Sequence, residues 1–242
     1  MTKERIQKII AAAGIHSRRA VEQLIEERKI KVNGVVVTAK GHKADPEVDR
    51  IQVAGKAFVF KRPEVATCVL INKPRQILVS KTDPLKRKTV YDLLPKKYQN
   101  LRPVGRLDYN SQGALLLTDD GDMILKLTHP RYHLDKIYEV KLSSHPEPKQ
   151  IQLLQQGIIL DGVRTLPATV TLMKQNKAST VLKFVLNEGK NRQIRRMCES
   201  VGLTVKELKR LSIGPIKLKN LRSGQYRVLL RSEMKSIMTD KK

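Results

Sequence analysis

The chain has 242 residues, of which 40% are hydrophobic, and this is enough for one or two packed domains. Its 48 Lys and Arg outnumber its 23 Asp and Glu, which gives a formal net charge of +25. Such a charge indicates a polyanionic partner, because each neutralised phosphate releases condensed counterions. The sequence has no run of 18 or more apolar residues and no signal-peptide segment, so we expect a cytoplasmic protein that does not act at a membrane.

Cysteine and histidine usage argues against a metal or disulfide framework. Cys68 and Cys198 lie far apart among apolar neighbours, so we expect two buried free thiols. His129 and His133 have the i, i+4 spacing of a metal-binding helix, but Pro130 opposes a continuous helix there. The chain also lacks a P-loop, G-x-S-x-G and G-x-G-x-x-G, which removes the sequence support for nucleotide hydrolysis, serine hydrolysis and dinucleotide binding.

The first sixty residues carry the signals of two short helices followed by a β-hairpin. Apolar residues recur at helical spacing in two segments, and Gly14 and Ser17 between them are typical of a helix end and a helix start. Asn33-Gly34 between β-branched residues is a strong signal for a hairpin turn. The sequence predicts helices over residues 4–13 and 18–28, the hairpin at Asn33-Gly34 and a short strand over 49–53.

This N-terminal segment is similar to a known RNA-binding module. The sequence RIQKIIAAAGIHSRRAVEQLIEERKIKVNGVVV resembles the S4-type RNA-binding domain over most of residues 3–55. The resemblance implies RNA contact through the two helices and the hairpin. Arg18 and Arg19 are the best candidates for that contact, because they open the second helix, where main-chain N–H groups also favour phosphate.

The sequence changes character over residues 57–66, where Pro63 indicates a linker. We therefore expect two domains, residues 1–60 and 61–242. In the second domain, strand-like segments without regular intervening helices favour an α+β fold over a doubly wound sheet. The sequence predicts strands over 67–72, 114–118, 137–142, 169–173 and 181–186, and helices over 90–94, 123–127 and 153–159.

Residues 191–201 form the clearest predicted helix of the chain. Its apolar residues follow the i, i+3, i+4, i+7 pattern of one buried face. Arg192 and Arg196 share another face, and Lys190 lies in the glycine turn just before the helix. A basic helix N-terminus beside such a turn is suited to anions, so these three residues are candidate RNA contacts.

Asp108 is a single acid between an arginine-containing turn and a strand-like run. The plain interpretation is that its side chain caps a turn, since aspartate is common there. The functional interpretation is a carboxylate that nearby arginine keeps ionised and that attacks a sugar carbon. In a basic RNA-binding chain without a metal cluster, such a carboxylate suits chemistry on a nucleoside.

Four motifs in sequence resemble those of pseudouridine synthases of the RsuA/RluB group: GRLDYNSQGALLLTDDG, KIYEV, EGKNRQIRRM and LKRLSIGPIKLKNLRSGQYRVL. The resemblance covers nearly the whole chain and implies a catalytic domain with a mixed, mostly antiparallel sheet flanked by helices. It implies that Asp108 is the catalytic residue and that Tyr138 lies against the target base. It also implies that Arg195 pairs with Asp108, and Arg106 is a second candidate for that pairing.

The chain departs from the group at a few positions. Ser111 and Ala114 stand where threonine and leucine are common. After Asn72-Lys73-Pro74 the group usually has a glycine two residues on, and here Arg75-Gln76 follows. Lys73 and Arg106 are further candidate RNA contacts.

The resemblance implies that uracil is detached, rotated and rejoined to the sugar through carbon five. The target uridine must first leave its stack, which costs a few kcal/mol that RNA contacts offset. Asp108 either adds to the sugar or promotes loss of a sugar proton. No metal or organic cofactor is implied, because the isomerisation involves no net redox change.

The resemblance favours large-subunit ribosomal RNA as substrate, because EGKNRQIRRM and the basic C-terminal part are more similar to the large-subunit enzymes of the group. One alternative is the same reaction on small-subunit ribosomal RNA. Another is a non-catalytic, RNA-binding ribosome assembly factor, which would not need Asp108, Tyr138 and the QIR helix together. We expect a monomer.

Overall fold

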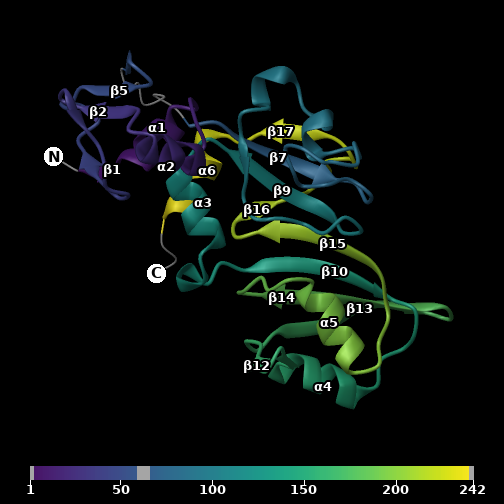
Figure 1. The fold of residues 1–242 in the computed structure, drawn as a ribbon. Helices are drawn as coiled ribbons and strands as arrows, with labels where there is room; N and C mark the ends of the chain where they lie inside the picture. The colour runs from purple at the N-terminus through teal and green to yellow at the C-terminus, as the bar shows by residue number, and fades with distance from the viewer. Residues whose placement is uncertain (1–2, 59–65, 240–242) are drawn as a thin grey trace. The chain divides into compact units, whose positions relative to one another are not determined.

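The computed structural model describes residues 3–58 and 66–239. The chain divides into two compact units, Met1–Ala66 and Thr67–Lys242, and Figure 1 colours the smaller one purple to dark blue. The expected boundary between residues 60 and 61 falls within residues 59–65, which lie outside the described residues. Within the described ranges, no helix is both long and apolar enough to cross a membrane.

The smaller unit contains the predicted helices and hairpin around one apolar core. The Ser17 hydroxyl caps the second helix by accepting the Ala20 N–H at 3.2 Å. Asn33 and Gly34 both have positive φ, as the predicted hairpin turn requires. The elements are α1 (Ile6–Ala12), α2 (Arg18–Glu26), the sheet β3 (Val35–Val36), β2 (Ile30–Val32), β5 (Ile51–Val53) and β6 (Lys56–Phe58), and the pair β1 (Glu4–Arg5) and β4 (Lys43–Ala44).

The larger unit is built on one mixed sheet, which has nine strands among the described residues. Its main path runs β13-β14-β10-β15-β9-β7-β17, with β8 beside β9 and β16 beside β15. Among the strands that the structure describes in this sheet, only the β9–β15 pair is parallel, so the expected mixed, mostly antiparallel sheet is confirmed. The strands are β7 (Cys68–Lys73), β8 (Arg102–Pro103), β9 (Gln112–Thr118), β10 (Lys136–Leu142), β13 (Thr169–Asn176), β14 (Ser179–Leu186), β15 (Val205–Ile213), β16 (Ile216–Lys217) and β17 (Tyr226–Val228).

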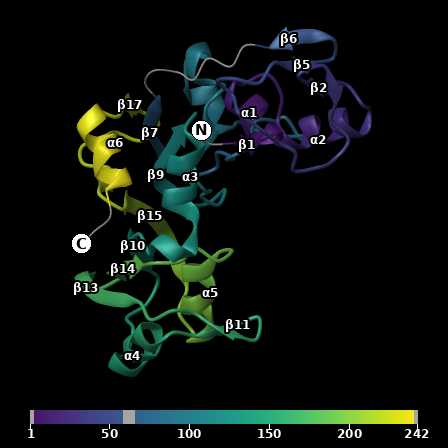
Figure 2. The same cartoon turned by 90° about the vertical axis from the view of Figure 1, so that its left-hand side faces the viewer.

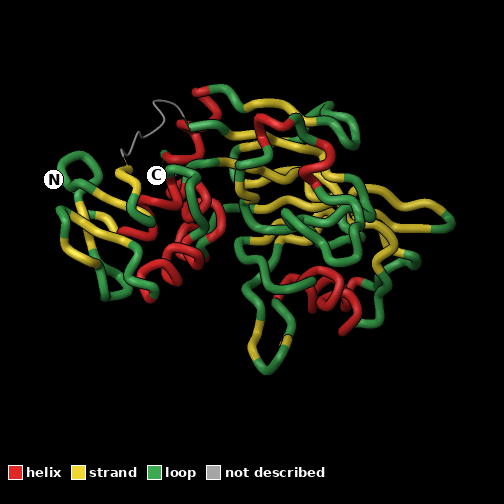
Figure 3. Tube along the Cα trace, turned by 45° about the horizontal axis from the view of Figure 1, so that its top comes forward, coloured by secondary structure: helices red, strands yellow, loops and turns green. Residues whose placement is uncertain are grey.

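Helices pack on both faces of this sheet, so the α+β class is also confirmed. On one face, α4 (Pro148–Gln156), α5 (Gln193–Ser200) and the 3-10 turn η1 (Val90–Leu93) contribute to the larger core cluster. On the other face, α3 (Gly121–Thr128) and α6 (Arg231–Met238) pack on β7 and β9. Figures 1 and 2 show α4 and α5 beside the β13-β14-β10 half, and Figure 3 colours the strands yellow and the helices red.

The structure differs from the predicted elements in several places. Residues 4 and 5, expected to begin the first helix, form β1, and short strands such as β6 and β8 were not predicted. The helix expected over 153–159 is α4, which starts at Pro148. Glu147 and Gln150 form a capping box there, and proline is favoured in the first helical turn. It ends at Gly157, whose φ is +88°. Strand β15 was not predicted, since its charged residues hide the alternation, and α6 was not predicted because it buries little more than Ile237.

The parallel β9–β15 pair depends on a glycine. Arg210 of β15 lies opposite Gly113 of β9, and Gly113 has a φ of +108°. A Cβ at Gly113 would lie 2.2 Å from the Arg210 carbonyl oxygen, closer than Cβ atoms come to non-bonded neighbours in proteins. Because that neighbour is backbone within a sheet, neither strand can move aside without breaking the pairing.

We predict that Gly113→Ala lowers the free energy of unfolding by about 3 kcal/mol or more, because it combines a backbone clash with a positive φ. Urea denaturation followed by circular dichroism measures this change. Gly121→Ala is the matched control, since the nearest atom there is the flexible Arg102 side chain at 3.5 Å and the residue opens α3. A Gly113→Ala protein as stable as the parent would show that the two strands adjust.

Candidate active site

Asp108 begins a tight turn that leads into β9. The Ser111 N–H donates to the Asp108 carbonyl at 3.0 Å, which closes the turn. The Asp108 carboxylate is half-buried, and among the described residues its hydrogen-bond partner is the Ser111 hydroxyl at 3.5 Å, a long contact. It accepts no N–H from the described backbone. The carboxylate therefore does not cap the turn and stays available for chemistry.

The Lys73 side chain stabilises this turn through hydrogen bonds to main-chain carbonyls. Its side chain is fully buried at the end of β7. The ammonium donates to the carbonyls of Ser111 at 2.8 Å, Pro74 at 2.9 Å and Asp108 at 3.2 Å, with the Tyr109 carbonyl at 3.5 Å. The expectation that Lys73 contacts RNA is wrong, because a side chain with no exposed surface cannot reach a phosphate. Its charge instead fixes the backbone that carries Asp108.

The Lys73 ammonium also places a positive charge within the Asp108 turn. Burial lowers the pKa of Lys73 to about 8, and the Asp108 charge acts in the opposite direction. The lysine is thus mostly protonated at pH 7 and adds positive potential beside the Asp108 carboxylate.

Arg195 approaches the same turn from α5. Its guanidinium donates to the carbonyls of Asn110 at 3.2 Å and Val205 at 3.0 Å. It does not form a direct ion pair with Asp108, although the Asp108 charge opposes the lowering of the Arg195 pKa by burial and by Arg192. The Arg195 Nε is buried without a partner among the described residues. The structure therefore brings Arg195 to the turn through backbone carbonyls.

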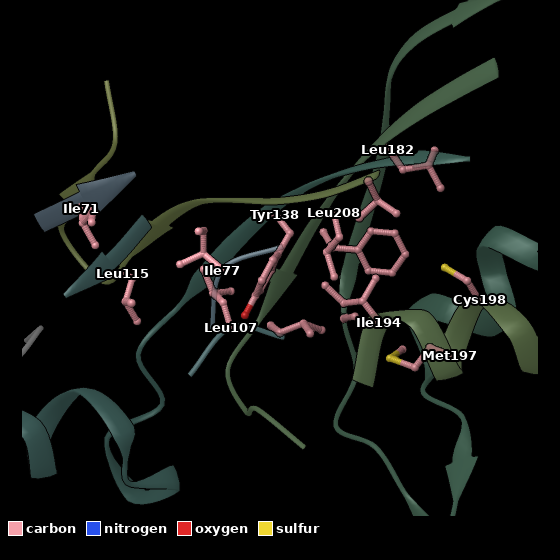
Figure 4. Packing of buried hydrophobic residues seen from close by; sticks show 14 of the residues in the cluster. Ile71, Ile77, Leu107, Leu115, Tyr138, Leu182, Ile194, Met197, Cys198 and Leu208 are labelled. Atoms are coloured by element: carbon pink, nitrogen blue, oxygen red, sulfur yellow. The ribbon is translucent and has the colours of Figure 1, made fainter. Parts of the chain in front are cut away.

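Tyr138 lies on β10, two strands from β9. It pairs with Arg210 of β15, which pairs in turn with Gly113. The tyrosine is 9% exposed and belongs to the core cluster that includes Leu107, next to Asp108. Figure 4 shows its ring between Ile77 and Leu208. Tyr138 is thus a largely buried aromatic residue on the sheet face that carries Lys73 and Leu107.

The remaining predicted RNA contacts divide into free and engaged side chains. Arg18, Arg19, Arg106 and Arg192 are exposed, and none of the four donates to, or pairs with, another side chain of the described ranges. Arg196 instead forms a bidentate pair with Asp161 at 2.9 and 2.5 Å.

Lys190 is bonded within its own loop through its main chain, and its side chain makes one long contact outside that loop. Its N–H donates to the Gln193 side chain at 3.0 Å, and its ammonium lies 3.5 Å from the Arg164 carbonyl.

Two residues that position the site were not identified from the sequence. Gln193 is buried at the start of α5 and also donates to Glu188 at 2.6 Å, which orders the loop before the helix. Gln76 takes the place of the usual glycine with a φ of +60°, and its N–H donates to the Tyr109 carbonyl at 2.7 Å. The absence of the usual glycine at this position was the sequence signal for Gln76. The turn forms with glutamine there, in a backbone conformation that favours glycine.

The site offers no obvious metal ligands. In residues 3–58 and 66–239, no three His, Cys, Asp or Glu side chains gather as a metal site would require. Both cysteines are buried free thiols, and burial raises the pKa of each to about 12, so neither is a ready nucleophile.

Comparison with known proteins identifies the family. The model for RNA pseudouridylate synthase matches residues 67–200, and the model for the S4 domain matches residues 4–49. The first match covers more than half of the chain. The chain therefore belongs to the RNA pseudouridylate synthase family, whose members are isomerases that convert uridine to pseudouridine, and it carries an N-terminal S4 domain.

Individual relatives match over nearly the full length. The chain is 39% identical over 236 residues to a Bacillus subtilis protein named ribosomal large subunit pseudouridine synthase B. This match covers 97% of this chain and 95% of that one. It is 37% identical to an uncharacterized RNA pseudouridine synthase from Aquifex aeolicus, over 97% and 93% of the two chains. A solved pseudouridylate synthase structure has a TM-score of 0.68 at 28% identity, over 97% of this chain and 99% of that one.

We predict that Lys73→Met lowers the free energy of unfolding by about 3 kcal/mol, because it leaves buried carbonyls without a donor. It also lowers kcat, since the Asp108 turn loosens, while the dissociation constant for RNA changes little. Chemical denaturation and single-turnover assays measure the two effects.

Lys190→Met serves as the control for removing a lysine, with an expected stability change within about 0.5 kcal/mol. Unaltered stability of Lys73→Met, together with a weaker salt dependence of RNA binding, would show that Lys73 contacts phosphate after all.

Proposed function

We propose that the protein converts a uridine of large-subunit ribosomal RNA to pseudouridine, with Asp108 as the catalytic carboxylate. The observation that carries the proposal is the Asp108 turn. Its carboxylate is half-buried, the buried Lys73 ammonium donates to the Asp108 carbonyl, and Arg195 donates to the Asn110 carbonyl. A half-buried carboxylate beside two cations is suited to attack on a sugar carbon. The large-subunit substrate is supported by the Bacillus subtilis relative, whose name states that specificity.

The reaction needs only the residues of this site. The bond between the sugar carbon C1′ and uracil N1 breaks, and a bond from C1′ to uracil C5 forms. The proton lost from C5 is balanced by one gained at N1, so no oxidant, reductant or cofactor is consumed. Asp108 assists the cleavage, either by adding to the sugar or by promoting loss of a sugar proton.

Tyr138 and Arg195 support this chemistry in different ways. Apolar neighbours hold the Tyr138 ring, and its proposed role is to pack against the extruded base, as aromatic residues commonly do beside an unstacked base. Arg195 fixes the Asn110 carbonyl and keeps its charge near Asp108. The Arg195 Nε is buried without a partner among the described residues, which is costly for a donor. We propose that a direct Arg195–Asp108 pair forms when RNA binds and gives this guanidinium an acceptor.

RNA binding is distributed over both units. Arg18 and Arg19 extend from the start of α2 in the S4 domain, and Arg106 and Arg192 are exposed in the catalytic unit. The net charge of +25 supports long-range attraction to RNA, and it also opposes self-association. We therefore propose that the enzyme acts as a monomer, in the cytoplasm where ribosomal RNA is made.

We predict that Asp108→Asn abolishes pseudouridine formation while leaving the fold and RNA affinity intact. The amide is isosteric with the carboxylate, but it carries no charge and cannot act as a nucleophile or base. The measurement is carbodiimide-stop mapping of large- and small-subunit ribosomal RNA from cells without the gene, after treatment with parent or variant protein.

One new stop in large-subunit RNA that depends on Asp108 is the expected result. A stop in small-subunit RNA would assign the enzyme to that substrate. Tight binding without a stop in either RNA, whether free or within assembling particles, would favour a non-catalytic assembly factor.

We predict that the double variant Arg18→Gln/Arg19→Gln weakens RNA binding and flattens its salt dependence. If each arginine neutralises one phosphate, the slope of log K against log salt falls by about 1.4 to 1.8. Titrations at several salt concentrations measure this slope. Lys29→Gln is the matched control, because Lys29 already pairs with Glu27 at 2.7 Å. An unchanged slope for the double variant would place the RNA elsewhere on the S4 domain.

A further inference from the structure

Tyr109, the residue after Asp108, is presented at the surface from a fixed backbone. Its carbonyl accepts the Gln76 N–H at 2.7 Å and lies 3.5 Å from the Lys73 ammonium. The residue is nevertheless 37% exposed. Most tyrosines of the catalytic unit pack into cores or against their own turns, whereas this ring stands at the edge of the catalytic turn with area left for another partner.

One partner of the ring is an arginine from a distant loop. The Arg87 guanidinium carbon lies 5.9 Å from the centre of the Tyr109 ring, within cation–π range. Asp83 fixes that guanidinium through contacts of 3.0 Å to Nε and 2.7 Å to an Nη, and it also accepts the Arg87 N–H at 3.0 Å. The Arg87 side chain is therefore held in place and still 45% exposed.

Arg87 belongs to a basic loop that suits an RNA backbone. Between β7 and η1, the exposed cations outnumber the single acid, Asp83, whose charge is already used by Arg87. Bonding to Arg87 lowers the pKa of Asp83 to about 2, so this carboxylate stays ionised across the working pH range. The exposed cations are Arg75, Lys81, Lys86, Arg87 and Lys88.

We propose that Tyr109 and Arg87 form a stacking site for the base next to the target uridine. This inference rests on the proposed function, because it requires an extruded uridine at Asp108. When a nucleotide leaves the stack, its neighbour loses a stacking partner. Tyr109 adjoins Asp108 in the chain, so its ring is placed to supply the missing partner. Asp83 is a positioning residue that acts through Arg87.

The proposed ligand is single-stranded or locally unpaired RNA, without a requirement for one particular base. Aromatic stacking accepts every base, since every base has a π-face, and an arginine plane stacks in the same way. Tyr109 and Arg87 therefore add affinity and register, and the identity of the target uridine is read elsewhere.

The test uses the RNA segment identified by carbodiimide mapping and the full-length Asp108→Asn protein, so that binding is measured without turnover. The base on each side of the target is replaced in turn by 2-aminopurine or removed to leave an abasic site. We expect 2-aminopurine on one side to be quenched on binding, and Tyr109→Leu to abolish the quenching. We also expect Tyr109→Leu to weaken binding about tenfold, the effect of losing one stacked base, and Tyr109→Phe to retain both signals.

The abasic RNA separates stacking from a merely structural role. The parent protein should lose about the same tenfold on the abasic RNA, and Tyr109→Leu should then lose nothing further. If Tyr109→Leu weakens intact and abasic RNA equally, the ring only supports its loop and the proposal is wrong. Tyr98→Leu, which removes a ring 4.9 Å below Lys97, controls for loss of an aromatic–cation contact.

Arg87 and Asp83 are tested in the same assay. Arg87→Gln should reduce quenching and affinity, and Asp83→Asn should reduce them less, because the guanidinium remains but is no longer fixed. Unchanged quenching in Arg87→Gln would remove Arg87 from the site.

Turnover separates this inference from the proposed function. If Tyr109→Leu in the active protein turns over RNA as fast as the parent at low RNA concentration, this inference alone is overturned. If the parent itself is inactive, the proposed function is overturned.

Discussion

The catalytic unit depends on one buried ammonium. Lys73 ends β7 with no exposed surface, and its ammonium donates to main-chain carbonyls of the Asp108 turn and to that of Pro74, its own neighbour. A carbonyl cluster of this kind repels itself and would be costly to bury without a cation. The lysine therefore joins two chain segments 35 residues apart and sets the position of the Asp108 backbone before any RNA is present.

The sheet places the other components around that turn. The parallel contact between β9 and β15 brings Gly113 against Arg210, and the next strand, β10, carries Tyr138 at the same level. Because the strands are about 4.8 Å apart, this register fixes the tyrosine relative to the turn that precedes β9. Helix α5 packs on the same face, so Arg195 reaches the Asn110 carbonyl. Each component thus comes from a different element, and the sheet holds them together.

Local signals in the sequence predicted most of the elements, and motif resemblance predicted the family. Ser17 and Asn33-Gly34 act through their immediate neighbours, so one sequence is sufficient to locate a cap or a hairpin. Lys73 was predicted to contact RNA, and this prediction was wrong because its carbonyl partners, at residues 108–111, lie far along the chain and cannot be recognised from the local sequence. The same reason explains Arg195, whose carbonyl partners come from the Asp108 turn and from β15. Long-range contacts of this kind leave no periodicity to detect.

The positive charge of the chain has two distinct uses, and only one of them concerns RNA. Lys73, Arg195 and Arg210 donate to main-chain carbonyls, the last through a 2.7 Å contact to Ala114, and they are wholly or partly buried. These cations satisfy main-chain carbonyls of the Asp108 turn and of β9 and β15. Exposed cations such as Arg18 and Arg87 remain available to phosphates and bases. The net charge alone therefore overstates the RNA-binding surface, and burial decides which basic residues belong to it.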